Sequence, residues 1–143
     1  AEASAATLLG LYQPIDEPED ALSSLDSQLR SLLPFDVVIL GMGDDGHTAS
    51  LFPGADGLQD ALDLQRDVYC AAMVPGTAKH KRMSLTLKAL VATQHLLVHI
   101  TGETKRSVLE YALIDAQVDK APIAALFLQS AVPVTVYWGG DSP

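Results

Sequence analysis

The chain has 143 residues and a net charge of -9, with 48% hydrophobic and 19% charged residues, which is typical of one globular domain. The negative charge argues against nucleic acid as a partner, because phosphate backbones are bound by basic surfaces. No apolar run reaches the roughly 20 residues of a membrane-spanning helix, so no membrane contact is expected. The single cysteine, Cys70, rules out an intrachain disulfide and suits a cytoplasmic location.

The first elements follow from apolar spacing and proline positions. Residues 1–10 are rich in helix formers, and without an initiator methionine they resemble the middle of a helix, which suggests a fragment. Residues 17–33 predict a helix, with Pro18 in its first turn and leucines at helical spacing. Pro34 ends it, and the apolar run 35–40 predicts a buried strand.

Strands and helices alternate through the rest of the chain. Strands are expected at 68–74, 95–101 and 132–138, with a short extended piece at 82–86. Helices are expected at 87–94 and 102–116, and residues 55–65 predict a loop with a short helix. This alternation predicts a single α/β domain over residues 1–143. Its parallel-type sheet is expected to carry helices on both faces, in a Rossmann-like three-layer arrangement.

A glycine-rich segment, residues 41–54, follows the first predicted strand and matches the pattern G-x-G-x-x-G. A dinucleotide site is nevertheless disfavoured, because Asp44 and Asp45 would repel a pyrophosphate. The next strand also ends without the acidic residue that would hold a ribose. A loop at the carboxyl end of a buried strand remains a common place for ligand and catalytic groups.

Hydrolysis of an ester or lactone makes better use of these residues. Histidine is the usual side-chain base at neutral pH, so His47 could deprotonate a water molecule, while Asp45 could orient its imidazole. Gly43 and Gly46 permit close approach, so their backbone amides could face the substrate. The alternative is a loop histidine bonded to the backbone, with Asp45 as a turn residue. Neither a metal nor a cofactor is required.

The segment from Phe35 to Gly54 resembles the signature of the 6-phosphogluconolactonases, a family of sugar-phosphate lactone hydrolases. The runs 82–86 and 102–105 are also similar to family patterns, which implies that Arg82 and Lys105 bind anionic oxygens of the substrate. The resemblance implies hydrolysis of 6-phospho-D-glucono-1,5-lactone to 6-phosphogluconate, in the pentose phosphate pathway, with His47 and Asp45 as the catalytic pair. The expected partner is this small-molecule lactone.

Two alternatives stay open. The related glucosamine-6-phosphate deaminase/isomerase loop carries a glutamate where this chain has Phe52, and an aromatic ring cannot transfer a proton. The chain could also be a sugar-phosphate-binding module without turnover.

The resemblance covers the C-terminal part of the family only. In the N-terminal part of the family, a Gly-Gly-[ST]-x-Pro loop is taken to hold the substrate phosphate, and the arginine of a D-E-R segment faces the substrate. Neither segment has a match in this chain. Activity of this chain alone is therefore uncertain. A missing N-terminal segment or a homo-oligomer is expected as a further partner.

Overall fold

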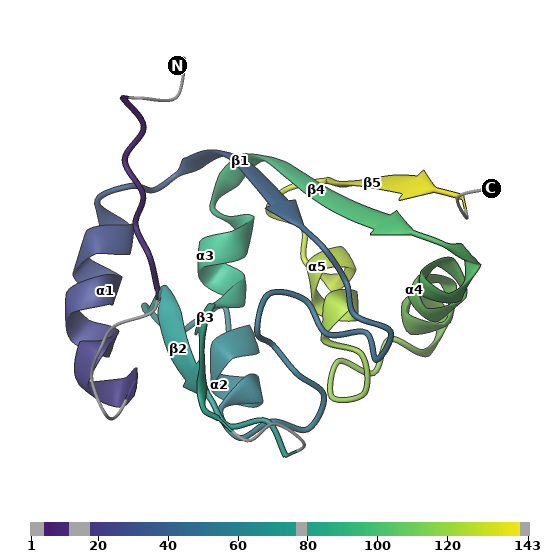
Figure 1. Cartoon of the computed structure of the whole chain (residues 1–143), viewed down its shortest axis with the longest axis horizontal. Helices are drawn as coiled ribbons and strands as arrows, with labels where there is room; N and C mark the ends of the chain where they lie inside the picture. Colours follow the sequence, from purple (N-terminus) through teal and green to yellow (C-terminus); the bar gives the residue numbers. More distant parts are fainter. Residues whose placement is uncertain (1–4, 12–17, 77–79, 141–143) are drawn as a thin grey trace.

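The computed structural model describes residues 5–11, 18–76 and 80–140 (Figure 1). Helical and extended segments alternate along this part of the chain. In chain order they are η1 (Pro18–Ala21), α1 (Leu22–Arg30), β1 (Phe35–Leu40), α2 (Leu58–Leu62), β2 (Cys70–Met73), β3 (Arg82–Leu85), α3 (Leu87–Val91), β4 (Thr93–Thr101), α4 (Glu103–Asp115), η2 (Pro122–Ala124), α5 (Ala125–Leu128) and β5 (Val134–Gly139).

Three parallel strands form the main sheet, in the order β1-β4-β5. In the register of the sheet, Val38 of β1 is paired with Leu96 of β4, and Leu96 is paired with Val134 of β5. The α/β fold with a parallel sheet is thus confirmed. The strand expected at 68–74 does not join it, because β2 pairs antiparallel with β3 in a separate two-stranded sheet.

The core lies on one face of the main sheet. Val38, Leu96, Val98 and Ile100 are buried and alternate with less buried neighbours, as the two-residue period of a strand requires, and they point toward the helices. Figure 1 shows α3, α4 and α5 on this side of the sheet. Together with η2, these helices bring buried residues to the same cluster, among them Leu90, Leu109, Ala112, Ile123 and Leu126. In the described part of the chain, the helices that pack on this sheet therefore cover one face, and the expected third layer is not seen.

The leucine-rich helix expected at 17–33 is present but shorter. Leu25 and Leu29 of α1 are buried against Cys70 of β2, whereas Leu32 lies beyond the helix and is 51% exposed. Residues 31 and 32 form a turn, in which the Leu32 amide donates to the Leu29 carbonyl at 2.9 Å, and Pro34 disfavours helical geometry at Leu33. The helix suggested at 1–10 is not seen over residues 5–10, and residues 1–4 lie outside the described part. Over residues 5–10, Leu8 is 92% exposed and Leu9 packs against the cluster around Leu25, so this stretch buries no continuous helix face.

Two differences concern the second half. Helix α3 ends at Val91, and β4 already begins at Thr93, so the helix expected at 87–94 is too long. The helical segment η2–α5 was not predicted, because residues 122–126 are all buried and show no amphipathic period. Among the described helices, none is long and apolar enough to cross a membrane.

Candidate active site

The loop after β1 folds back on itself and presents His47 at the carboxyl end of the sheet. The Gly43 amide donates to the His47 carbonyl oxygen at 2.9 Å, and the Gly46 amide donates to the Gly43 carbonyl at 3.0 Å. The hydroxyl of Thr48, which is buried, donates to the Gly41 carbonyl at 2.9 Å. These bonds give the loop a defined shape without secondary structure. They also use the amides of Gly43 and Gly46, so in this structure these glycines provide space and do not donate outward.

Two contacts dock this loop on the rest of the molecule. Gly46 has a φ of 78°, and a Cβ atom there would lie 2.9 Å from the Cβ of Ala121. The Ile123 amide also donates to the Gly46 carbonyl at 3.0 Å. On the other side, the buried hydroxyl of Ser84 on β3 accepts from the Ser50 amide at 3.2 Å. The loop is therefore fixed between β3 and the start of η2.

His47 and Asp45 form a close pair within the loop. One carboxylate oxygen of Asp45, Oδ1, lies 2.6 Å from Nδ1 of His47 and accepts the His47 amide at 3.1 Å. Partial burial acts to raise the pKa of Asp45. Hydrogen bonds from the His47 amide and ring, together with the charge of the imidazolium, outweigh that effect and lower the pKa below its usual 3.8. Asp45 is therefore a carboxylate at neutral pH and can hold Nδ1 of the ring as a donor.

Two further residues fix the position of the imidazole. The ring of Phe52 lies with its centroid 4.5 Å from that of His47, at an interplanar angle of 33°. A Cβ atom on Gly43 would come within 2.2 Å of Nδ1 and Cε1, so only glycine leaves room for the ring. No described residue forms a hydrogen bond to Nε2, which leaves this nitrogen available to a water molecule. The packing of Phe52 against the imidazole was not predicted from the sequence. There, Phe52 was noted only because it replaces the glutamate of the deaminase/isomerase loop.

A cavity of about 510 Å³ joins His47 to a cationic side chain. Lys105 reaches it from the first turn of α4, because β4 lies next to β1 and both strands end at the same edge. Its lining residues are Ile39, Leu40, Gly41, Met42, Gly43, His47, Ala49 and Lys105. The sequence prediction thus gains geometric support for Lys105. Arg82 is exposed on β3, on the same strand face as Ser84, and does not line this cavity.

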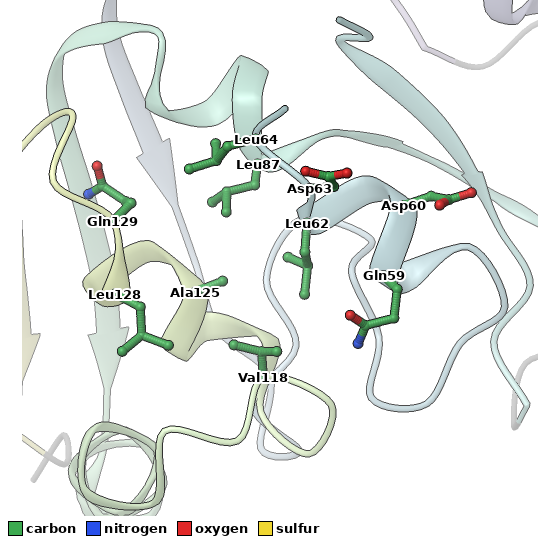
Figure 2. Close-up of a pocket in the computed structure, with 10 residues that line it drawn as sticks. All are labelled: Gln59, Asp60, Leu62, Asp63, Leu64, Leu87, Val118, Ala125, Leu128 and Gln129. Carbon is green, nitrogen blue, oxygen red and sulfur yellow. The ribbon is translucent and has the colours of Figure 1, made fainter. Parts of the chain in front are cut away.

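Another cavity, of about 520 Å³, lies on the helical side of the molecule. Figure 2 shows Leu62, Leu87 and Leu128 around it, and Asp60 and Asp63 also line it. No lysine or arginine is among its lining residues, so its charge does not suit a phosphorylated ligand.

Within the described residues there is also no group of three or more His, Cys, Asp or Glu placed to hold a metal ion.

The family of the chain follows from comparison with known proteins. A family model described as glucosamine-6-phosphate isomerases/6-phosphogluconolactonase matches residues 2–138. The chain belongs to this family. A 6-phosphogluconolactonase from Pseudomonas aeruginosa is 41% identical over 138 residues, which are 96% of this chain and 57% of the relative. One from Mesorhizobium japonicum is also 41% identical, over 95% of this chain and 57% of the relative.

Solved structures of the family agree with the fold. A crystal structure of a 6-phosphogluconolactonase from Shewanella baltica has a TM-score of 0.82 and 39% identity, over 96% of this chain and 58% of its own. A monomeric glucosamine-6-phosphate deaminase has a TM-score of 0.65 and 18% identity, which shows a shared fold alone. The chain therefore spans a little over half the length of these lactonase relatives.

Proposed function

We propose that this chain carries the catalytic loop of a 6-phosphogluconolactonase and hydrolyses 6-phospho-D-glucono-1,5-lactone to 6-phosphogluconate. The observation that carries the proposal is the His47–Asp45 pair, with 2.6 Å between Nδ1 and Oδ1, in a cavity that also holds Lys105. The relatives named 6-phosphogluconolactonase support the choice of substrate. Water is the second substrate, and no redox partner is needed. A cytoplasmic location belongs to the same proposal.

The first step is attack of water on the lactone carbonyl. Nε2 of His47 accepts a proton from the water as its oxygen bonds to the carbonyl carbon, which gives a tetrahedral oxyanion and an imidazolium. The carboxylate of Asp45, 2.6 Å from Nδ1, stabilises that imidazolium and keeps Nε2 toward the water. Positioned proton transfer of this kind contributes about 10²- to 10⁴-fold to a rate.

The second step opens the ring. The carbonyl reforms, the bond between the carbonyl carbon and the ring oxygen breaks, and the imidazolium returns its proton from Nε2 to the leaving oxygen. His47 is then neutral again, and the product is a carboxylic acid with a free hydroxyl. Lys105, in the same cavity, is assigned to anionic oxygens of the substrate. Arg82, which lies on β3 outside the cavity, is assigned a weaker role in attracting the anionic substrate.

The aromatic side chain of Phe52 disfavours deaminase and isomerase activity. Those reactions need a second group that moves protons on the sugar, and in this chain the corresponding side chain is an aromatic ring against His47. The loop therefore offers one titratable base supported by one carboxylate, which suits hydrolysis.

One experiment separates the candidate functions. The chain is given freshly generated 6-phosphogluconolactone, with spontaneous opening subtracted, and in parallel glucosamine 6-phosphate, with ammonia release measured. We expect lactone opening above background and no ammonia. Ammonia release would favour the deaminase. Tight binding of 6-phosphogluconate without turnover of either substrate would favour a binding module.

A further inference from the structure

The single tryptophan of the chain, Trp138, lies near the end of β5 and contacts the start of α4, the helix that carries Lys105. Its indole Nε1 donates to the Gly102 carbonyl oxygen at 3.1 Å. The Gly102 amide in turn donates to the carbonyl oxygen of Gly139, the residue after Trp138, at 2.9 Å. Both backbone polar groups of the residue that precedes α4 are therefore bound to the end of β5.

Gly102 sets the direction in which α4 leaves the sheet. Its backbone has a φ of 84° and a ψ of 156°, a conformation that favours glycine. The Arg106 amide donates to the same Gly102 carbonyl at 3.3 Å, in the first turn of the helix. A helix holds its first turn weakly, because its first amides have no acceptor within the helix. The hydrogen bond from Trp138 therefore adds a side-chain anchor at the point where the helix provides the least support.

The same indole also holds Arg106, the cation next to Lys105. The guanidinium carbon of Arg106 lies 4.8 Å from the centroid of the Trp138 ring, which is a cation–π contact. Its Nε donates to Oε1 of Glu110 at 2.9 Å. Arg106 does not line the cavity that holds His47. Of the two adjacent cations in the first turn of α4, Lys105 is therefore the one that reaches the candidate active site.

The position of the Lys105 ammonium depends on the backbone of this first turn. Among the described residues, none forms an ion pair with Lys105, so no side chain holds the ammonium in the cavity. A shift or rotation of the first turn would move the ammonium relative to His47. Because a lysine side chain is long and flexible, such a movement should weaken substrate binding without abolishing it.

We propose that Trp138 is a positioning residue for substrate binding: its indole fixes the first turn of α4 so that Lys105 reaches the anionic oxygens of the substrate. Trp138 itself does not touch the substrate and acts through Lys105. This inference rests on the proposed function, because it takes a sugar-phosphate anion as the ligand of the cavity that holds His47 and Lys105.

The test compares Trp138→Phe with the control Tyr137→Phe. The first substitution keeps an aromatic ring beside Arg106 and removes the Nε1 donor. Tyr137 is the preceding residue of β5, is 57% exposed and points to the opposite face of the strand. Trp138→Phe should raise Kd for 6-phosphogluconate and KM for the lactone by about three- to tenfold, the usual effect of one lost hydrogen bond. It should leave kcat within about twofold, and Tyr137→Phe should change neither binding constant.

Two further measurements distinguish positioning from general destabilisation. In a double-mutant cycle, Trp138→Phe should raise Kd by less than about twofold when Lys105→Gln is already present, because the group through which it acts is gone. Amide hydrogen exchange should be at least about threefold faster at Arg106 in Trp138→Phe, as the first turn of α4 loosens. Tyr137→Phe should not change the exchange rate there.

Several results would overturn the inference. They are equal effects of the two aromatic substitutions, full additivity of Trp138→Phe with Lys105→Gln, an unchanged Kd despite faster exchange at Arg106, or no affinity of the unmodified chain for 6-phosphogluconate. The affinity and exchange measurements do not depend on turnover. The expected pattern in Kd without lactone opening would therefore refute the proposed hydrolysis and leave the role of Trp138 standing. Lactone opening with a Kd and KM insensitive to Trp138→Phe would do the reverse.

Discussion

Oδ1 of Asp45 lies 2.6 Å from Nδ1 of His47 and 3.1 Å from the amide nitrogen of the same residue. One oxygen atom therefore holds both the ring and the backbone of the proposed base. The pKa of Asp45 is lowered, so this support is present above the usual carboxylate pKa and is lost as the pH falls through the lowered value. At neutral pH the pair is intact.

Asp45→Asn should lower kcat for lactone hydrolysis by about 10²- to 10³-fold, within the range known for misoriented catalytic groups. An asparagine cannot stabilise the imidazolium by charge, and its amide can turn a donor toward Nδ1. KM should change little, because Asp45 is not assigned to the substrate. Steady-state kinetics measure the effect, and Asp44→Asn serves as the control for loss of a neighbouring exposed carboxylate. Equal rates for the two variants would contradict the assigned role.

Gly43→Ala should displace the imidazole and lower kcat by at least tenfold, since the new Cβ would lie 2.2 Å from ring atoms of His47. The matched control is Gly41→Ala in the same loop, where the nearest atom would be the His99 carbonyl oxygen at 3.9 Å, an ordinary contact. The two variants are compared by kinetics and by thermal unfolding. If both lose the same fraction of activity, the space at Gly43 is not what positions the ring.

Lys105→Gln should raise KM with a smaller effect on kcat, because Lys105 is assigned to binding of anionic oxygens and not to proton transfer. Lys120→Gln removes the same charge from a lysine outside the His47 cavity and should leave KM within about twofold. The comparison also controls for the change in net charge. A similar rise in KM for both variants would mean a general electrostatic effect.

Asp67 should make stability depend on acid pH. Lys88, with Nζ 3.0 Å from Oδ1, and Arg30, with Nη1 2.9 Å from Oδ2, lower the pKa of Asp67 to about 2. The unfolded value is about 3.9, so the folded state gains stability above that pH and loses it as the pH falls toward 2. Urea unfolding at pH 6 and at pH 3 should show a smaller decrease for Asp67→Asn than for the unmodified chain.

The effect at Asp67 is expected to be modest, because its side chain is 64% exposed and solvent screens the pairs. Asp36→Asn is the control, at an exposed aspartate of β1 that forms no ion pair with a described residue. If the two variants have the same pH dependence, Lys88 and Arg30 do not stabilise the fold through Asp67.

The sequence predicted what depends on local pattern. The apolar run 35–40 and the glycines after it correctly indicated a strand followed by a ligand-type loop, and the structure brings His47 and Asp45 into contact there. The leucine spacing likewise indicated α1, although the helix ends at Arg30, before Leu32 and Leu33. The contact between Asp45 and His47 could be predicted from the sequence, because two residues this close in the chain stay close in space whatever the fold.

Long-range relationships could not be read in the same way. The pairing of β2 with β3, outside the main sheet, depends on contacts that no local period encodes. The Ser84 hydroxyl, which accepts a hydrogen bond from the Ser50 amide, belongs to a strand far along the chain. Lys105 reaches the cavity only because β4 lies beside β1, whereas Arg82, chosen on the same kind of resemblance, lies outside it. The uncovered sheet face was likewise visible only once side-chain exposure was known.

The most direct test of the central claim is the rate of 6-phosphogluconolactone opening by the unmodified chain and by His47→Gln, with spontaneous opening subtracted. Affinity for 6-phosphogluconate is measured alongside. We predict that the substitution lowers the catalysed rate by about 10²-fold or more, as expected for loss of a general base, and that it affects product affinity far less than the rate. A variant that keeps its rate within about tenfold of the unmodified chain would show that His47 is not the base.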